Sequence, residues 1–363
     1  MGRAKKCEPG EKRQALAGMS RTAACLIGGI HRWMEKLTAF LNGLAGDYME
    51  EVGSHLAVPM AFYREGRPVA PGDAATAGRA TGKVAVFVHG LCCTERVFDF
   101  PGQPGVTYGM MLEKDLGYTP CFVRYNTGVR VEENGKRLSR LVDELAAAYP
   151  VPVTEILFVG HSMGGLVAKC AIADGFSRKA SWTEASLASV YLGTPHRGAP
   201  LEKGVHLATR LLGLAGFPLA VSLRDFLDFR SAAIKDLRFG RVVDNHDGFS
   251  RVRQLAVAGT FTTDPGHPAS LALGDLLVRV QSARAAAASR GLEPGADFLL
   301  AAGLHHFALA RDMGVYRKIA AWTAGKPVPL PGGDEAGADA QARVFPVSDN
   351  TMKPKRREPC PSF

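Results

Sequence analysis

The chain has 363 residues and a formal net charge of +9 at pH 7; 46% of its residues are hydrophobic and 22% are charged. Such a composition can bury a large core, which excludes a wholly disordered chain, a collagen-like protein and a disulfide scaffold. The length fits two or three domains, or one enlarged α/β domain. Part of the positive charge lies at the two ends, without interleaved aromatic residues, so we expect no nucleic-acid partner.

The cysteines and the apolar stretches indicate in which compartment the protein is expected. Seven cysteines without a regular spacing argue against a secreted disulfide framework. The best apolar stretch, residues 22–30, falls short of the roughly 18 residues that a membrane-spanning helix needs, and no signal-peptide cleavage pattern follows it. We therefore expect free thiols and a cytoplasmic protein.

Residues 1–22 are basic and are expected to form a flexible N-terminus, and residues 23–56 carry a helical pattern. Apolar residues recur there at steps of three and four, which marks one face of a helix or of a broken pair of helices, interrupted near Gly43 and Gly46. We expect this face to pack on the main domain; a dimer contact and a peripheral contact with a membrane surface are the alternatives. The apolar positions are Leu26, Ile30, Met34, Leu37, Leu41, Leu44 and Tyr48.

Residues 57–324 are expected to form the main domain, in which short apolar runs alternate with helical patterns. Continuous apolar runs too short for helices are typical of parallel strands buried on both faces. The alternation predicts an α/β fold with a mostly parallel sheet and helices on both faces. The predicted strands are residues 84–88, 121–125, 156–159, 188–192, 252–258 and 298–302, and the predicted helices include residues 131–148 and 165–173.

Two segments depart from this alternation. Residues 197–250 include the apolar stretch LATRLLGLAGFPLAVSL between two predicted strands, which indicates an inserted helical cap. Residues 325–363 are rich in proline, glycine and charge and lack an apolar period, so we expect a disordered C-terminal tail.

The pentapeptide Gly160-His161-Ser162-Met163-Gly164 stands between a predicted buried strand and a predicted helix. A serine hydroxyl is a poor nucleophile unless the protein exposes it on a sharp turn, near a base and near donors for the developing oxyanion. The strand before and the helix after favour a nucleophilic Ser162 over an ordinary glycine-rich turn. The N-terminal end of that helix also favours negative charge.

An oxyanion hole in such a site takes one backbone amide from the residue after the nucleophile and one from the loop after an earlier strand. Met163 is the candidate for the first amide. Leu91, which follows Gly90 just after the strand at 84–88, is the candidate for the second. We expect His89 to anchor this loop by hydrogen bonding rather than to act as the base.

The base and its acid are expected later in the chain, in the order serine, acid, histidine, each after a strand. His305 and His306 both follow the predicted strand at 298–302, and one of them is the expected base. Asp275 is the favoured acid. Asp264, which lies nearer the strand at 252–258, is the alternative.

With these motifs the chain resembles the α/β-hydrolase-fold serine esterases and lipases, and among them the bacterial type of GPI inositol-deacylase-like lipases. The resemblance covers about residues 82–320 and rests on FVHGL at 87, GHSMGGLVA at 160, LGTPHRGAPLEKG at 192, GDLLVRVQSA at 274 and HHFALARDMGVY at 305. It implies that His306 is the base and His305 a neighbour. It keeps Asp275 as the acid, although Leu276 and Arg279 stand where this branch usually has glycine and proline.

The resemblance also implies that the segment after Leu192 lines the mouth of the active site, with His196 as a structural or rim residue. Cys92 and Cys93 are expected to be packed free thiols, with a vicinal disulfide as the alternative. The apolar run of the cap either binds an acyl chain or packs on the domain. The candidate substrate-binding residues are His89, His161, His196, Leu212 and Phe217.

These features predict a carboxylic-ester hydrolase that acts on lipid-like or otherwise apolar acyl esters through an acyl-enzyme. Ser162 is the expected nucleophile, His306 the base and Asp275 the acid. An acyltransferase on the same fold and a non-catalytic lipid-binding protein are the alternatives. The sequence holds no metal-binding motif, so we expect neither a metal nor another cofactor.

Overall fold

The computed structural model describes residues 9–74, 80–103, 105–196, 231–239, 247–260, 262–264, 267, 275, 278, 296–325 and 343–346. Most of the predicted cap, including Leu212 and Phe217, lies outside this part of the chain. Of the cap region the structure describes helix α8 (Ala232–Phe239) and the beginning of a 3-10 turn, η4 (Asp247–Arg251).

One sheet organises the described residues, with the strand order β2-β1-β4-β3-β5-β6-β7-β8-β9. β1 runs antiparallel to both β2 and β4, and all the other neighbouring strands pair in parallel. The strands are β1 (Ala61–Arg64), β2 (Arg67–Val69), β3 (Lys83–Val88), β4 (Thr119–Arg124), β5 (Glu155–His161), β6 (Ser186–Leu192), β7 (Val252–Gly259), β8 (Asp297–Ala302) and β9 (Arg343–Pro346).

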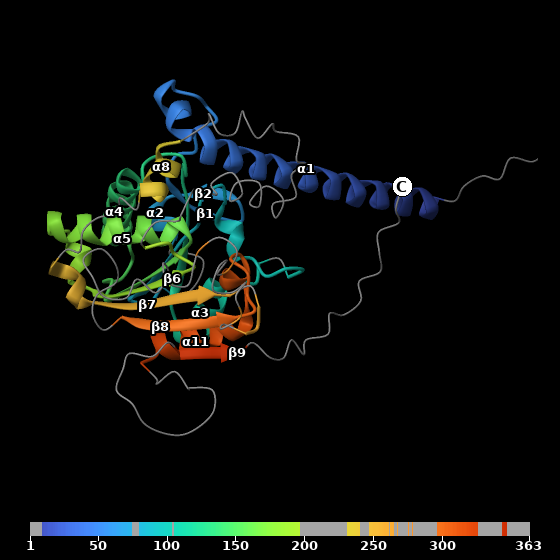
Figure 1. The fold of residues 1–363 in the computed structure, drawn as a ribbon. Coiled ribbons are helices and arrows are strands. Elements are labelled where there is room, and N and C mark those ends of the chain that lie inside the picture. The colour runs from blue at the N-terminus through green and yellow to red at the C-terminus, as the bar shows by residue number, and fades with distance from the viewer. Residues whose placement is uncertain are drawn as a thin grey trace, which may run out of the picture.

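Helices cover both faces of this sheet (Figure 1). Successive side chains of a strand point to opposite faces, so each buried strand contributes to two cores. Val86 packs in the core under α4 (Val131–Ala148) and α5 (Met163–Arg178), whereas Phe87 packs in the core under α3 (Tyr108–Leu116) and α11 (Met313–Thr323). The strand order, the parallel pairing and the two helical layers confirm the predicted α/β-hydrolase fold.

The predicted elements fall close to the observed ones. Each of the six predicted strands coincides with one of the strands β3 to β8, with boundaries that differ by at most two residues. The helix predicted at 131–148 is α4, and the one predicted at 165–173 lies inside α5. Short elements complete the described fold: α2 (Pro71–Ala74), η1 (Glu95–Phe98), η2 (Ser181–Glu184) and η5 (Ala308–Ala310).

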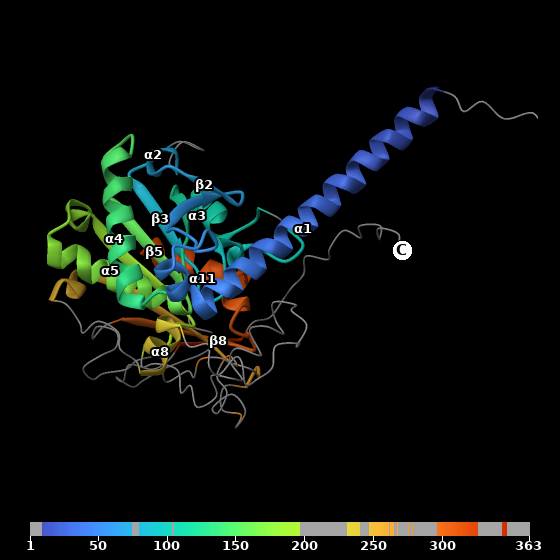
Figure 2. The ribbon, with the colours of Figure 1, turned by 90° about the horizontal axis from the view of Figure 1, so that it is seen from above.

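Helix α1 (Pro9–Glu51) begins earlier than the sequence pattern predicted. We expected a flexible segment up to residue 22, but the backbone is helical from Pro9 onward. Proline is favoured at the first position of a helix, and the alanine-rich stretch that follows has high helix propensity. The expected interruption between Gly43 and Gly46 is present as a kink at Ala45. The two views agree that α1 extends away from the domain (Figures 1 and 2).

A second difference concerns the C-terminal segment. We expected residues 325–363 to be disordered throughout, but Arg343–Pro346 forms β9 and pairs in parallel with β8. Valine and phenylalanine, both favoured in strands, stand at the centre of this short run. In the described part of the chain no helix has both the length and the apolar content to cross a membrane.

Candidate active site

Ser162 lies on the turn between β5 and α5, with φ 56° and ψ −126°. This is a conformation that residues other than glycine rarely adopt, at a cost of about 1–3 kcal/mol. Two backbone hydrogen bonds hold it: Ser162 donates its amide to the Leu192 carbonyl at 2.8 Å, and Gly165 donates to the Ser162 carbonyl at 3.1 Å. The residue is half-buried. The strained turn therefore presents the serine hydroxyl at the end of a rigid strand.

The glycines around Ser162 allow three backbones to approach closely. A Cβ atom on Gly160 would collide with the backbone of Gly165, and one on Gly164 would collide with the carbonyl of Val88. Backbone cannot move aside without disturbing the sheet, so a side chain at either glycine would push β5, α5 and the end of β3 apart. This is the physical reason for the G-x-S-x-G pattern.

Asp275 and His306 form a buried pair. Nδ1 of His306 lies 2.7 Å from Oδ2 of Asp275, and the side chains are 2% and 1% exposed. The backbone amide of His306 donates to the Asp275 carbonyl at 3.1 Å, and Oδ1 of Asp275 accepts from the Val278 amide at 2.8 Å. Because a carboxylate can only accept a hydrogen bond, the proton of the neutral His306 ring lies on Nδ1. Nε2 is then the ring nitrogen that can take up a proton.

The alternative acid and base lie elsewhere. Asp264 and His305 are both exposed, and the contact with His306 is made by Asp275. Burial, followed by the charge of Arg311, lowers the pKa of His305. The structure therefore brings Asp275 together with His306, as the sequence analysis favours, and leaves Asp264 and His305 at the surface.

The serine turn and the Asp275–His306 pair meet at one edge of the sheet. The ring of His161, the neighbour of Ser162, contacts the His306 carbonyl through Nε2 at 3.2 Å, and the two rings are 4.8 Å apart. Gly193, at the end of β6, is close enough that a Cβ there would lie 2.9 Å from Nδ1 of His306. Ligands of open α/β sheets bind at this edge, where the parallel strands end.

The loop after β3 runs directly past the nucleophile. A Cβ on Gly90 would lie 2.8 Å from that of Ser162. Leu91 follows Gly90, and Met163 is the first residue of α5, so the backbones of both candidate oxyanion donors adjoin Ser162. Cys92, in a left-handed conformation at φ 58°, donates its amide to Oγ1 of Thr127 at 3.2 Å, and Cys93 donates to the Gly90 carbonyl at 3.2 Å.

His89 is fully buried and braces this loop. Its ring stacks on Tyr125 at 4.6 Å, and the Tyr125 hydroxyl donates to the His89 carbonyl at 2.7 Å. Nδ1 of His89 lies 3.0 Å from the Gly90 carbonyl. Burial lowers the pKa of His89 to about 3, so the ring is neutral. These contacts fit an anchor of the loop, which was the expected role.

His161 and His196 are also buried. Burial and the neighbouring His306 hold the pKa of His161 well below its ordinary value. Burial, assisted by the charge of Lys169, lowers the pKa of His196 to about 3, and its ring meets Tyr191 edge to face at 4.7 Å. Contact of His89, His161 or His196 with substrate stays a prediction, and Leu212 and Phe217 lie outside the described residues.

Sequence reasoning missed the support of the segment after His306. The Tyr108 hydroxyl on α3 donates to the Asp312 carbonyl at 2.7 Å, lies 3.0 Å from the Leu309 carbonyl, and accepts from the Asp312 amide at 2.8 Å. This buried tyrosine thereby fixes the start of α11, which follows the histidine. The contact spans about two hundred residues of sequence, so no local pattern could have indicated it.

Cys92 and Cys93 are free thiols. Burial raises the pKa of both, that of Cys93 to about 12, so neither is a thiolate at neutral pH. Within the described ranges, no three histidine, cysteine or acidic side chains are grouped as metal ligands would be.

Residues 122–212 match the family model described as "Putative serine esterase (DUF676)". The matched segment holds Ser162 and ends before Asp275 and His306. No match to the chain was found among curated proteins.

Similar solved structures include a lipase, BlEst2, of Bacillus licheniformis in its propeptide form, with 20% identity and a TM-score of 0.46 over 72% of this chain and 54% of that one. The chain therefore spans about half the length of that lipase. The esterase PF2001 of Pyrococcus furiosus has 14% identity and a TM-score of 0.43, covering 68% of this chain and 82% of that one. A thermophilic esterase of Thermogutta terrifontis has 16% identity and a TM-score of 0.40, covering 69% and 97%.

Proposed function

We propose that the protein is a serine hydrolase that cleaves carboxylic esters, with Ser162 as nucleophile, His306 as general base and Asp275 as the acid that orients it. The observation that carries the proposal is a coincidence of two independent features at one edge of the sheet. One is the strained backbone of Ser162, and the other is the buried hydrogen bond between Asp275 and His306. The family match over residues 122–212 supports the same reaction class.

The proposed reaction begins when Nε2 of His306 takes the proton of Ser162 as the serine oxygen attacks the acyl carbon. The charge that develops on the histidine is stabilised by Asp275, which is shielded from water and therefore acts in a medium of low dielectric. The amides of Leu91 and Met163 donate to the oxyanion, and the N-terminal end of α5 favours its negative charge. His306 then protonates the leaving alcohol, and water releases the acid from the acyl-enzyme by the same steps.

For the substrate we propose lipid-like or otherwise apolar acyl esters. The apolar residues of the sequence between 207 and 221 support this, because an acyl chain buried against them gains about 0.8 kcal/mol per methylene. The motif likeness to the GPI inositol-deacylase-like lipases supports the same class.

We expect kcat/KM to rise from acetate to medium-chain p-nitrophenyl esters. Leu212→Asp or Phe217→Asp should abolish that rise and spare acetate; a preference of the unaltered protein for acetate would contradict the substrate proposal.

The test of the reaction class is labelling with a fluorophosphonate probe followed by peptide mapping. We expect the label on Ser162, and Ser162→Ala should abolish both labelling and ester hydrolysis while thermal unfolding changes little. Ser181→Ala, at an exposed serine, is the matched control and should label normally. A label on another residue, or hydrolysis that survives in Ser162→Ala, would refute the assignment. Product analysis with added alcohol distinguishes hydrolysis from acyl transfer.

A further inference from the structure

Helix α1 exposes a group of large apolar side chains where it leaves the domain. Ile30, Trp33 and Met34 are 63%, 53% and 46% exposed. Their spacing of three and four residues places them within about 100° of arc on one face of the helix. Solvent exposure of three adjacent large apolar side chains, including a tryptophan, is unfavourable and marks an interaction surface.

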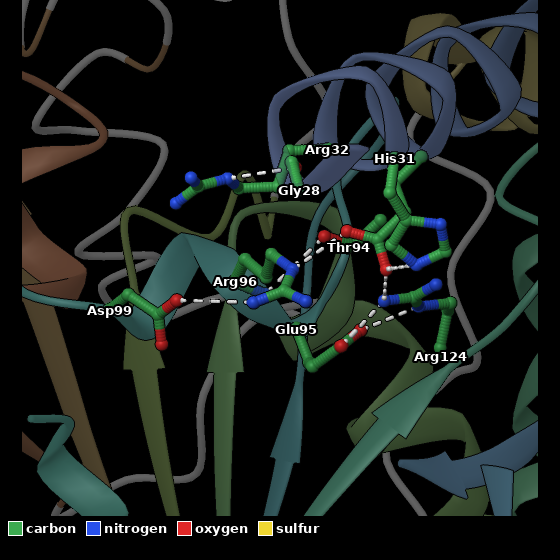
Figure 3. Close-up of polar contacts among 9 residues, drawn as sticks. Gly28, His31, Arg32, Thr94, Glu95, Arg96, Asp99 and Arg124 are labelled. Atoms are coloured by element: carbon green, nitrogen blue, oxygen red, sulfur yellow. Dashed lines mark hydrogen bonds and ion pairs between the residues drawn. The ribbon is translucent and has the colours of Figure 1, made fainter. Parts of the chain in front are cut away.

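Residues 28–36 of α1 place their acidic and their basic side chains in different environments. The acidic residue, Glu35, points into the domain, where it accepts from Nε of Arg96 at 2.8 Å and from Nη2 of Arg124 at 3.2 Å. Figure 3 labels Arg96 and Arg124 of this network, together with Glu95, to which Arg124 forms two further hydrogen bonds. Burial raises the pKa of Glu35, but the hydrogen bond from Arg96 and the charge of Arg124 together lower it overall, so the group stays ionised.

The basic residues of the segment face solvent instead. Arg32 and Lys36 are exposed, and the Arg32 side chain lies back along the helix, donating to the Gly28 carbonyl at 3.3 Å. In the sequence, residues 1–36 hold eight Lys or Arg and three Asp or Glu, a net charge of +5 out of the +9 of the whole chain. The domain neutralises Glu35, so the end of the molecule that carries the apolar group is strongly positive.

From this arrangement we propose that residues 28–36 of α1 lie along an anionic lipid surface, with Ile30, Trp33 and Met34 inserted at the boundary between headgroups and acyl chains and the basic residues at the headgroups. A helix that has one apolar face and a basic polar face binds in the plane of such an interface, and each Lys or Arg near the surface adds to the attraction. Tryptophan is favoured at this depth of a bilayer. Pairing with a second copy of α1 is disfavoured because it would bring two net charges of +5 together.

The part of α1 from Glu35 to Asn42, which contacts the domain, is called the root of α1 here. It determines which way the apolar group of Ile30, Trp33 and Met34 faces. Glu35, held by Arg96 and Arg124, points toward the domain, about half a turn away from the apolar group. The apolar side chains therefore face away from the domain, and α1 projects beyond it (Figures 1 and 2). A flat surface could meet this face without moving the domain.

The chain offers an internal reporter for the test. It has three tryptophans, and Trp182 and Trp322 are buried. A shift in tryptophan fluorescence on binding therefore reports on Trp33. The experiment mixes the full chain carrying Ser162→Ala, which does not consume lipid esters, with vesicles of equal parts phosphatidylcholine and phosphatidylglycerol. We expect the protein to sediment with these vesicles and its emission to move to shorter wavelength, with much weaker binding to pure phosphatidylcholine.

Two sets of variants separate insertion from charge. Replacing Ile30, Trp33 and Met34 by serine should weaken binding to the anionic vesicles by about tenfold or more. Arg32→Gln with Lys36→Gln should weaken it by roughly tenfold and leave binding to pure phosphatidylcholine unchanged. Met110→Ser with Val151→Ser, which removes exposed apolar side chains elsewhere, is the matched control and should bind normally. Trp33→Phe should keep binding and lose the fluorescence shift.

Absence of sedimentation with anionic vesicles would overturn the proposal. So would a change in sedimentation-equilibrium mass on replacing Ile30, Trp33 and Met34 in the absence of vesicles, because α1 would then be a contact between copies. Neither outcome bears on ester hydrolysis, which is measured on a soluble ester with the unaltered protein. The serine variants of α1 should hydrolyse that ester at the normal rate.

Discussion

The edge of the sheet that carries Ser162 and the root of helix α1 are held in different ways. At the edge, backbone hydrogen bonds position the segments that carry the reacting residues: Ser162 donates to Leu192, Gly193 to Val257, and His306 to Asp275. At the root of α1, side chains hold the helix, through the Glu35 network and through Asn42, which bonds the backbone of Leu56 and Val58. The backbone bonds belong to the strand ends and set where the reacting residues stand, whereas the side-chain pairs hold α1 against the domain. Substitutions of the reacting residues at the edge should therefore change rate, and those of the side-chain network at the root of α1 should change stability.

The largest effect is expected at the base. His306→Ala should lower kcat on a soluble ester by on the order of a millionfold, because the members of a catalytic triad act as a unit. The measurement is steady-state kinetics, with circular dichroism to confirm that the variant folds. His305→Ala, one residue away and exposed, is the matched control and should retain most of the activity. If His305→Ala proves the more damaging change, His306 is not the base.

The acid should come next. Asp275→Asn removes the carboxylate that orients His306 and favours the wrong tautomer, so kcat should fall by roughly four orders of magnitude. Asp264→Asn, at an exposed aspartate, should have a mild effect. Both variants are measured with the same soluble ester. The reverse ranking would move the acid to the earlier loop.

How far the sequence predicted each region follows from the same contrast. The close backbone approach at Gly160 and Gly164 requires a fixed residue type at a fixed spacing, so a short motif could reveal the turn at Ser162. The buried strands were predictable for a similar reason, because each needs a continuous apolar run. Which aspartate contacts His306 depended on the path of a loop, which no spacing determines.

The ion pairs that hold α1 against the domain could not be predicted from the sequence. Glu35 and Arg124 are 89 positions apart, and a charged residue on an amphipathic helix is usually a solvated one. The earlier start of α1 and the strand β9 were missed for another reason. Both are short or weakly patterned segments whose structure depends on helix propensity or on an open sheet edge, not on an apolar period.

Glu35→Gln tests whether side chains hold the root of α1. The substitution leaves the charges of Arg96 and Arg124 without their shared partner, although Arg124 keeps Glu95. We expect the free energy of unfolding, measured with urea, to fall by about 2–3 kcal/mol, with kcat/KM on a soluble ester unchanged. Glu132→Gln, which removes an exposed i,i+4 pair with Lys136, should have little effect on stability. A loss of rate in Glu35→Gln without a loss of stability would reverse the contrast between the two regions.

The smallest effect expected is a pH dependence that comes from buried histidines near the edge of the sheet. The pKa of His196 is about 3 in the folded protein and about 6.5 in an unfolded chain, so below pH 6.5 the unfolded chain binds a proton that the folded one does not. The free energy of unfolding is therefore highest above pH 6.5 and falls as the pH drops toward 3, by up to about 1.4 kcal/mol per pH unit for each such histidine. His89, whose pKa is also about 3, acts in the same direction.

Neither ring nitrogen of His196 has a hydrogen-bond partner among the described residues, so His196→Phe should fit the site at neutral pH. Urea unfolding at pH 7 and pH 5 should show a loss smaller by about 2 kcal/mol in His196→Phe than in the unaltered protein, and an unchanged loss in His55→Phe, at an exposed histidine. Equal losses in all three proteins would mean that His196 becomes protonated without unfolding, and that this part of the edge opens to water.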